Sequence, residues 1–248
     1  MANDVRFDFS GTTVLVTGGT SGIGHAVAGA FADAGARVTV TGTRAAASDY
    51  TVDLTRFTYR QLDVRDATAV DALGAEITTL DVLVNNAGAN FAGGDEWDPD
   101  GFSAALECNV EGAMRLTTRC RGALAASTLT GGASVVNVVS MTAFRSTTVV
   151  PGYSAAKAAL LALTRNFAVQ WVGDGIRVNA VAPGLVDTPM TAPMADWPEM
   201  LEIEMAKVAI QRMGTPAEVA AAVLFLSSSA SAYTTGSALV VDGGYLAV

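Results

Sequence analysis

The sequence predicts an α/β protein built on one doubly wound parallel sheet of about seven strands, with helices on both faces. Short runs rich in β-branched residues alternate with longer helical stretches along the whole 248-residue chain. Several of these runs are apolar at nearly every position, as in strands that are covered on both faces. A glycine-rich turn, residues 18–24, joins the first run to the first helical stretch. Together these observations favour a Rossmann-type arrangement with right-handed crossovers.

Seven segments have the pattern of strands. They are 12–17, 37–41, 57–62, 80–85, 134–139, 176–181 and 238–241. Helical patterns lie between them, near residues 22–34, 66–76, 99–127, 152–172 and 216–228. The last helix has the clearest start, because Thr215 is a suitable N-cap, Pro216 fits the first helical position and Glu218 can complete a capping box. No repeat or linker interrupts the alternation, so residues 1–248 are predicted to form a single domain.

Residues 185–213 are the one segment that departs from the alternation. The segment contains three prolines, several methionines, Trp197 and a group of acidic residues. It lies between a strand and a helix, at the edge of the sheet where the carboxyl ends of the strands meet. An insertion at this place is a candidate substrate lid. The alternative interpretation is a poorly packed surface segment without a function.

Composition and charge exclude several classes of function. The formal net charge is −9, so we expect no basic surface for the phosphates of a nucleic acid or for an anionic membrane. No apolar run is long enough to span a bilayer, and residues 1–6 do not resemble a signal peptide. The single histidine and the two cysteines are not spaced as a metal site or a disulfide framework. We therefore expect a cytoplasmic protein without a metal.

The glycine-rich turn is suited to binding a phosphate group. Of Gly18, Gly22 and Gly24, one permits a tight turn, one lets the backbone approach a pyrophosphate and one lets the helix pack against the strand. The N-terminus of the following helix favours negative charge. The spacing Gly-x3-Gly-x-Gly differs from the Gly-x-Gly-x-x-Gly dinucleotide fingerprint and therefore indicates another family. A sharp turn without a ligand is the alternative.

The pair Tyr153 and Lys157 is the first candidate for catalysis. Four residues apart on a helix, the two side chains lie one turn apart on the same face. A phenol titrates near pH 10, and a nearby ammonium group is expected to lower its pKa because it favours the phenolate. Tyr153 is therefore a candidate acid/base. Taken alone, however, such a pair is more often an ordinary feature of an amphipathic helix.

Taken together, the motifs resemble the short-chain dehydrogenase/reductase family over essentially the whole chain, and its 3-oxoacyl reductase-like members in particular. Residues 17–24 resemble the coenzyme turn of the family, and residues 85–88 resemble its motif after the fourth strand. Residues 183–188 are similar to the loop on the nicotinamide side, and residues 242–244 to the C-terminal signature. The resemblance implies a nicotinamide-dependent oxidoreductase.

The resemblance implies four catalytic residues: Asn109, Ser140, Tyr153 and Lys157. Tyr153 would exchange a proton with the substrate oxygen, which Ser140 would bind and orient. Lys157 would stabilise the phenolate and hold the nicotinamide ribose. Asn109 would hold a water molecule that links Lys157 to solvent. The alternative for Asn109 is an irregular helix in which its side chain satisfies backbone groups.

The same resemblance implies the residues that bind the cofactor. They are Gly18, Thr20, Ser21, Gly22, Ile23, Gly24, Arg44, Asp63, Val64, Asn86, Ala87, Gly88, Tyr153, Lys157, Pro183, Gly184, Val186 and Thr188. NADP is favoured, because Gly42 stands where NAD-binding relatives carry an acidic residue, and Arg44 just beyond it could bind a 2′-phosphate. NAD stays an alternative, since the usual arginine of the family falls at Thr43 and a basic residue of the turn is replaced by Ser21.

The expected substrate is a small, apolar secondary alcohol or ketone in contact with Ser140, Thr142, Tyr153 and Met190. Relatives that reduce 3-oxoacyl groups on an acyl carrier protein have basic residues beside the cleft, where this chain has Asp174. Such a thioester reductase is the alternative within the class. An isomerase or dehydratase with a tightly held cofactor and an inactive nucleotide-binding scaffold are the alternatives outside it.

A homo-oligomer, either a dimer or a tetramer, is the expected assembly. The long helical stretches 99–127 and 152–172 carry more apolar surface than one face of the sheet requires. This surplus suits a symmetric interface between helices of two copies.

Overall fold

The centre of the protein is a parallel sheet with the strand order β3-β2-β1-β4-β5-β6-β7. The structure is a computed structural model that describes residues 5–91 and 94–247. Its strands are β1 (Thr13–Val16), β2 (Arg37–Gly42), β3 (Thr58–Gln61), β4 (Val82–Asn85), β5 (Ala133–Val138), β6 (Ile176–Pro183) and β7 (Ala238–Val241). All pairings between neighbouring strands are parallel. The predicted fold class is therefore confirmed.

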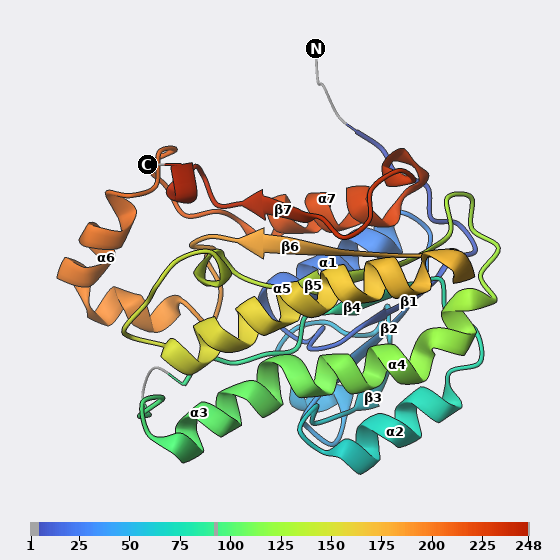
Figure 1. Cartoon of the computed structure of the whole chain (residues 1–248), viewed down its shortest axis with the longest axis horizontal. Helices are drawn as coiled ribbons and strands as arrows, with labels where there is room; N and C mark the ends of the chain where they lie inside the picture. The colour runs from blue at the N-terminus through green and yellow to red at the C-terminus, as the bar shows by residue number, and fades with distance from the viewer. Residues whose placement is uncertain (1–4, 92–93, 248) are drawn as a thin grey trace.

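Helices cover both faces of the sheet (Figure 1). They are α1 (Gly22–Asp33), α2 (Ala67–Glu76), α3 (Pro99–Leu106), α4 (Gly112–Ala125), α5 (Pro151–Trp171), α6 (Pro198–Met205) and α7 (Pro216–Ser227). Helices α1 and α7 pack together on one face, and α2, α4 and α5 lie on the other. The capping box predicted for the last helix forms between Thr215 and Glu218. In the described part of the chain, no helix has both the length and the apolar character needed to cross a bilayer.

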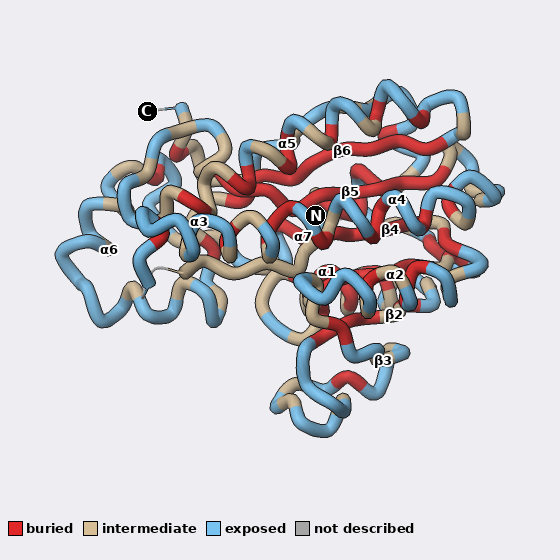
Figure 2. Tube along the Cα trace, turned by 60° about the horizontal axis from the view of Figure 1, so that its bottom comes forward, coloured by how far each residue is buried: buried red, intermediate tan, exposed pale blue. Residues whose placement is uncertain are grey.

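Alternate residues of the central strands fill the two halves of the core. Val14 and Val16 of β1 pack with Phe31 of α1, whereas Leu15 packs on the opposite face with Leu116 of α4. Figure 2 shows β4, β5 and β6 as buried strands between the helical layers. Burying each large apolar side chain stabilises the fold by about 1.5–3 kcal/mol relative to its exposure. The carboxyl edge of the sheet is thus held on a rigid support.

The helix predicted over residues 99–127 is divided in the structure. A π-helical turn, Glu107–Glu111, separates α3 from α4. The wider turn places Asn109 and Val110 in the interior. Such turns occur mostly inside α-helices and frequently at functional sites. Hydrophobic periodicity did not reveal the turn, because one extra residue in a long helix changes the pattern only slightly.

Residues 185–213 form the most weakly packed part of this edge. Helix α6 buries no residue, and it is pale blue with some tan in Figure 2. The ends of the segment are better anchored, since Val186 and Val208 are buried and Val186 forms a β-bridge with Gly214. Between them, Glu204 of α6 accepts a hydrogen bond from the Tyr245 hydroxyl. The segment is therefore exposed in its middle and fixed at both ends.

Candidate active site

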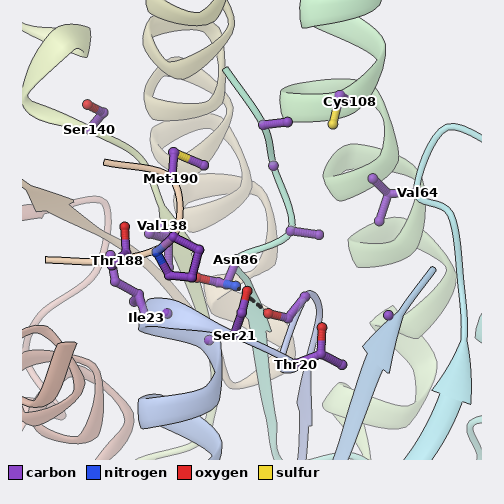
Figure 3. A pocket seen from close by; sticks show the side chains of 18 of the residues that line it. Thr20, Ser21, Ile23, Val64, Asn86, Cys108, Val138, Ser140, Thr188 and Met190 are labelled. Carbon is purple, nitrogen blue, oxygen red and sulfur yellow. Dashed lines mark hydrogen bonds between the residues drawn. The ribbon is translucent and has the colours of Figure 1, made fainter. Parts of the chain in front are cut away.

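A cleft opens where the strand order reverses. Successive crossovers proceed outward in opposite directions from β1 and β4, so the loops that follow these two strands diverge at the carboxyl edge of the sheet. The cleft there has a volume of about 470 Å³. In Figure 3, Thr20 and Ser140 lie at opposite ends of this cleft, with Asn86 and Met190 between them. The cleft is therefore long enough to bring the glycine turn and Ser140 into one site.

Nearly all of the residues predicted to bind the cofactor line this cleft. They are Gly18, Thr20, Ser21, Gly22, Ile23, Gly24, Asp63, Val64, Asn86, Ala87, Gly88, Tyr153, Lys157, Pro183, Gly184, Val186 and Thr188. Of the predicted substrate contacts, Ser140, Tyr153 and Met190 also line it. These residues come from segments far apart in the sequence, and the parallel sheet brings them to one edge.

The glycine turn has the shape of a phosphate cradle. Gly18 has a φ of +64°, and a Cβ at this position would lie 2.9 Å from the Cα of Ala87. A Cβ at Gly24 would lie 2.3 Å from the Asn86 Nδ2 atom. The N-cap of α1, Ser21, makes no side-chain capping bond, so the first N–H groups of the helix stay available to a ligand. These donors at a positive helix end fit the pyrophosphate of a dinucleotide.

Hydrogen bonds hold the loop after β4 against the loop after β1. The Thr17 hydroxyl accepts the backbone N–H groups of Asn86 and Ala87, both at 3.0 Å. In return, Asn86 Nδ2 donates to the carbonyls of Thr17 and Gly18, at 3.0 and 3.1 Å. The asparagine of the predicted motif therefore fixes the wall of the cleft through backbone groups, which explains why an amide side chain is needed there.

Ser140, Tyr153 and Lys157 form a group in the same cleft. Ser140 follows β5, and its hydroxyl accepts the N–H of Thr142 at 3.1 Å. Lys157 is 3% exposed, and its Nζ donates to the Val138 carbonyl at 3.0 Å and lies 5.4 Å from the centroid of the Tyr153 ring. The predicted pairing of tyrosine and lysine on one face of α5 is therefore present.

The pKa of Tyr153 differs from the expectation. Burial raises the pKa of Tyr153 to about 12; the Ser140 hydroxyl opposes this shift, and the charge of Glu96 adds to it. Burial also lowers the pKa of Lys157 to about 8. The predicted lowering of the Tyr153 pKa by Lys157 is therefore wrong for this structure. The physical reason is that desolvation outweighs the attraction of an ammonium group that lies over the ring and loses its proton near pH 8.

The structure shows the backbone interpretation of Asn109, and it leaves one side-chain oxygen without a partner among the described residues. Its Nδ2 donates to the carbonyls of Ala89 and Ala105, at 2.8 and 3.0 Å, so the side chain does satisfy backbone groups. In the described part of the chain, its buried Oδ1 has no hydrogen-bond partner. A Cβ on Gly88 would lie 2.5 Å from this oxygen and 3.2 Å from Lys157 Nζ. Both atoms therefore face the same glycine, in a place where a water molecule would satisfy them.

Arg44 and Thr142 do not line the cleft. The Arg44 guanidinium lies 4.8 Å from the centroid of the Tyr50 ring and donates to the Asp49 carbonyl. Thr142 lies behind Ser140, where its carbonyl accepts a hydrogen bond from the Ser154 hydroxyl. Local partners hold the Arg44 side chain away from the cleft, whereas the buried Thr142 hydroxyl has no hydrogen-bond partner among the described residues.

Several lining residues were not found from the sequence. Among them are Tyr50, Leu62, Arg65, Ala89, Phe91, Cys108, Val138, Val139, Pro189 and Thr191. Tyr50 is the most informative, since a Cβ on Gly42 would lie 2.3 Å from its hydroxyl. Tyr50 belongs to no motif and reaches the cleft only through the fold of the loop after β2. The nearest signal in the sequence was Gly42, because the Tyr50 hydroxyl leaves no room for a side chain at that position.

The fold and the cleft together define a Rossmann-type dinucleotide-binding protein with a serine–tyrosine–lysine group beside the nucleotide site. The chain belongs to the short-chain dehydrogenase/reductase family. A family model described as enoyl-(acyl carrier protein) reductase matches residues 18–246.

Individual relatives agree with this assignment. The chain is 39% identical to galactitol 2-dehydrogenase (L-tagatose-forming) of Cereibacter sphaeroides, over 96% of each chain. It is 38% identical to cis-4-hydroxycyclohexanecarboxylate dehydrogenase of Sinomonas cyclohexanicum, over 97% of this chain and 98% of the relative. The solved structure of a candidate NAD(P)-dependent gluconate 5-dehydrogenase from Beutenbergia cavernae, with NADP bound at low occupancy, superposes with a TM-score of 0.88. That protein is 34% identical, and the match covers 98% of this chain and 100% of that one.

The glycine turn leads to a first prediction. Gly18→Ala should weaken NADPH binding about tenfold or more, because the new Cβ strains a backbone with positive φ and crowds Ala87. Isothermal titration calorimetry measures the effect. The matched control is Gly29→Ala in the middle of α1, where a Cβ would meet no atom within 4 Å. Equal affinities of the two variants would contradict the phosphate cradle.

The lowered pKa of Lys157 leads to a second prediction. An unfolded lysine keeps its proton to about pH 10.4, whereas the folded pKa is about 8. Between these values the unfolded chain binds more protons, so the contribution of Lys157 to stability should rise with pH, by about 2 kcal/mol from pH 8 to 10. Burial raises the pKa of Cys108 and Cys120, which opposes this rise over the same range, so the effect is measured as a difference between variants. In urea unfolding, the stability of the wild type and of Lys207→Met should rise with pH relative to that of Lys157→Met, and parallel pH dependences would contradict the lowered pKa of Lys157.

Proposed function

We propose that this chain is an NAD(P)-dependent oxidoreductase that interconverts a small, uncharged secondary alcohol and its ketone. One observation carries the proposal: the glycine turn and the group of Ser140, Tyr153 and Lys157 line a single cleft. The names of the relatives support it, since each describes a dehydrogenase of a hydroxyl-bearing compound. The proposed unit is one domain over residues 1–248, with residues 185–213 as a lid over the substrate.

In the proposed mechanism, Tyr153 moves the proton and Ser140 orients the substrate oxygen. When bound, the nicotinamide would supply or accept the hydride at the substrate carbon. With a pKa of about 12, Tyr153 is a neutral phenol near pH 7 and can donate its proton to a ketone oxygen. The pKa of Lys157, about 8, lets this residue accept and release protons near neutrality. A water held by Asn109 Oδ1 would continue the path from Lys157 to solvent.

The substrate end of the cleft favours an uncharged, partly apolar molecule. Ala89, Phe91, Val139 and Met190 line it, together with the hydroxyl-bearing residues of the catalytic group. Three residues lining the described cleft carry a charge: Asp63, Arg65 and Lys157. The first two pair with each other at 2.6 Å, and Lys157 is buried. The described lining therefore offers no free cation to a substrate carboxylate, although the names of two of the relatives describe substrates that carry one.

A thioester reductase acting on an acyl carrier protein is the second candidate, and the description of the matching family model favours it. The net charge of the chain opposes it. Contrary to the expectation from the sequence, Asp174 does not lie beside the cleft, because it follows the C-terminal end of α5, at the opposite end of that helix from Tyr153. Asp174 forms an ion pair with Arg121 at 2.7 Å, so this arginine is already neutralised. With a net charge of −9, the chain would also repel an acidic carrier at long range.

NADP is the favoured cofactor. The Tyr50 hydroxyl occupies the space in which a side chain at position 42 would lie, so no carboxylate can stand there to repel a 2′-phosphate. The Arg44 guanidinium lies over the Tyr50 ring, and Arg44 directly follows Thr43, which lines the cleft. The solved relative with NADP bound supports the same choice.

The cofactor proposal gives a third prediction. Arg44→Ala should raise the Michaelis constant for NADPH several-fold relative to that for NADH, because a guanidinium near the rim would attract the 2′-phosphate. Steady-state assays with both cofactors measure the ratio. Arg56→Ala removes an exposed arginine that is paired with Asp33 and serves as the control. An unchanged ratio in Arg44→Ala would show that Arg44 does not contact the phosphate.

The activity itself gives a fourth prediction. With a panel of ketones and secondary alcohols, absorbance at 340 nm should report turnover by the wild type. Tyr153→Phe should lose about 10²–10⁴-fold in kcat while still binding the cofactor. Turnover of acyl carrier thioesters alone would favour the second candidate. Cofactor that stays bound through purification with no net oxidation or reduction would favour an isomerase or dehydratase, or an inactive scaffold.

We further propose a homo-oligomer that forms through α4 and α5. Met114, Val169 and Val172 are exposed on and beside these helices, and a groove lined by Val110 and Leu163 runs between them. The fifth prediction is a dimer or tetramer in size-exclusion chromatography with light scattering, and a shift toward monomer for Val169→Glu. A monomeric wild type would contradict the proposal.

The proposed compartment is the cytoplasm. Both cysteines are free thiols in the structure, one of them buried and the other partly buried. Reduced thiols of this kind are typical of a reducing compartment.

A further inference from the structure

Glu96 is a buried carboxylate that the proposed mechanism does not use. It is 2% exposed, and each of its oxygens accepts one backbone N–H. Oε1 accepts from Phe91 at 2.9 Å, and Oε2 accepts from Tyr153 at 2.9 Å, across 57 residues of sequence. Among the described residues, no salt bridge involves Glu96. Burying a charge without a counter-ion is costly, so its place needs a physical reason.

The start of α5 supplies this reason. The N-cap residue is Val150, which has no side-chain oxygen and makes no capping bond. Pro151 follows and has no N–H to donate. The first turn therefore lacks the local cap that Ser, Thr, Asp or Asn would provide. The Glu96 carboxylate caps the Tyr153 N–H from another segment and places a negative charge at the positive end of the helix.

The local packing is built around this contact. A Cβ on Gly152 would lie 3.3 Å from Glu96 Oε2 and 2.9 Å from the Cβ of Ala105 in α3. Only the absence of a side chain at position 152 thus allows α3, the carboxylate and α5 to approach one another this closely. The contact joins the two walls of the substrate end, since Phe91 and Tyr153 both line the cleft.

We propose that Glu96 is a positioning residue: its carboxylate fixes the Tyr153 end of α5 to the Phe91 wall of the substrate cleft, and its charge acts on the Tyr153 phenol. This inference rests on the proposed function. Glu96 lies outside the recognised motifs, and its two hydrogen bonds hold Tyr153 and the Phe91 wall in a fixed relative position.

The charge of Glu96 adds a chemical effect to this structural one. The pKa of Tyr153 is raised first by burial and further by the Glu96 charge, while the Ser140 hydroxyl acts against both. The other groups that face the pair are Lys157, one turn along α5, and Cys108 of the π-helical turn, which lies near Lys157. A negative charge at the first turn of α5 disfavours the phenolate, so Glu96 adds to the effect of burial, which is the larger cause of the raised pKa of Tyr153.

The pH profile of kcat tests the role of the charge. In Glu96→Gln, loss of the negative charge should shift the Tyr153-dependent limb to lower pH by at least about 0.5 unit. Glu96→Asp keeps the charge and should keep the limb at its wild-type pH, even if kcat falls. The matched control is Asp100→Asn, which removes an exposed charge four residues away. A limb that moves equally in Glu96→Gln and Asp100→Asn would overturn the electrostatic role.

Hydrogen–deuterium exchange tests the positioning role without requiring turnover. At least one of the two peptides that contain Phe91 and Tyr153 should exchange faster in Glu96→Gln than in the wild type, because one of the two accepting oxygens becomes an NH2 group that cannot accept an N–H. In Asp100→Asn they should exchange at the wild-type rate. Unchanged exchange in Glu96→Gln would overturn this inference even in an active enzyme. Inactivity of the wild type toward every alcohol and ketone would instead count against the proposed function.

Discussion

The hydrogen bonds between the loops after β1 and β4 are the contact on which the site depends. The strand order reverses at this point, so the two loops would diverge without a tie. Thr17 and Asn86 connect them through four bonds to backbone groups. Because the glycine turn starts at one loop and the Gly88 wall at the other, the width of the cleft is set by this tie. The other segments that line the cleft are arranged around the space between these two loops, and the four hydrogen bonds keep the width of that space constant.

Helix α5 supplies the chemistry to this gap, and burial controls that chemistry. Its first two turns carry Tyr153 and Lys157, and desolvation moves their pKa values in opposite directions, to about 12 and about 8. The phenol therefore holds its proton at neutral pH, while the ammonium group exchanges its own easily. Tyr153 can thus donate a proton to the substrate oxygen, and Lys157 can pass a proton onward toward solvent. The position of the helix along its axis must then be fixed, and the contact from Glu96 to its first turn does so.

Local features of the sequence were sufficient for the fold, whereas most of the site residues followed from the resemblance to a known family. The alternation of apolar runs and helical stretches predicted the parallel sheet, since strands covered on both faces must be apolar throughout. The glycines at 18, 22 and 24 were recognisable because only this residue fits a tight turn against a neighbouring backbone. The helical repeat brings Tyr153 and Lys157 together on one face, but their roles followed only from the resemblance.

The tertiary structure alone decided the rest, because burial and contacts between distant segments leave no local pattern. Nothing near Glu96 in the sequence indicates that it caps a helix 57 residues away. Tyr50 and Arg44 likewise take their places from each other and from the loop after β2. The direction of the Tyr153 pKa also required the structure, since it depends on how much solvent the cleft removes. The sequence by itself determined which chemical groups are present and on which elements they lie. Only the packing of those elements decided which groups meet, and in what dielectric they act.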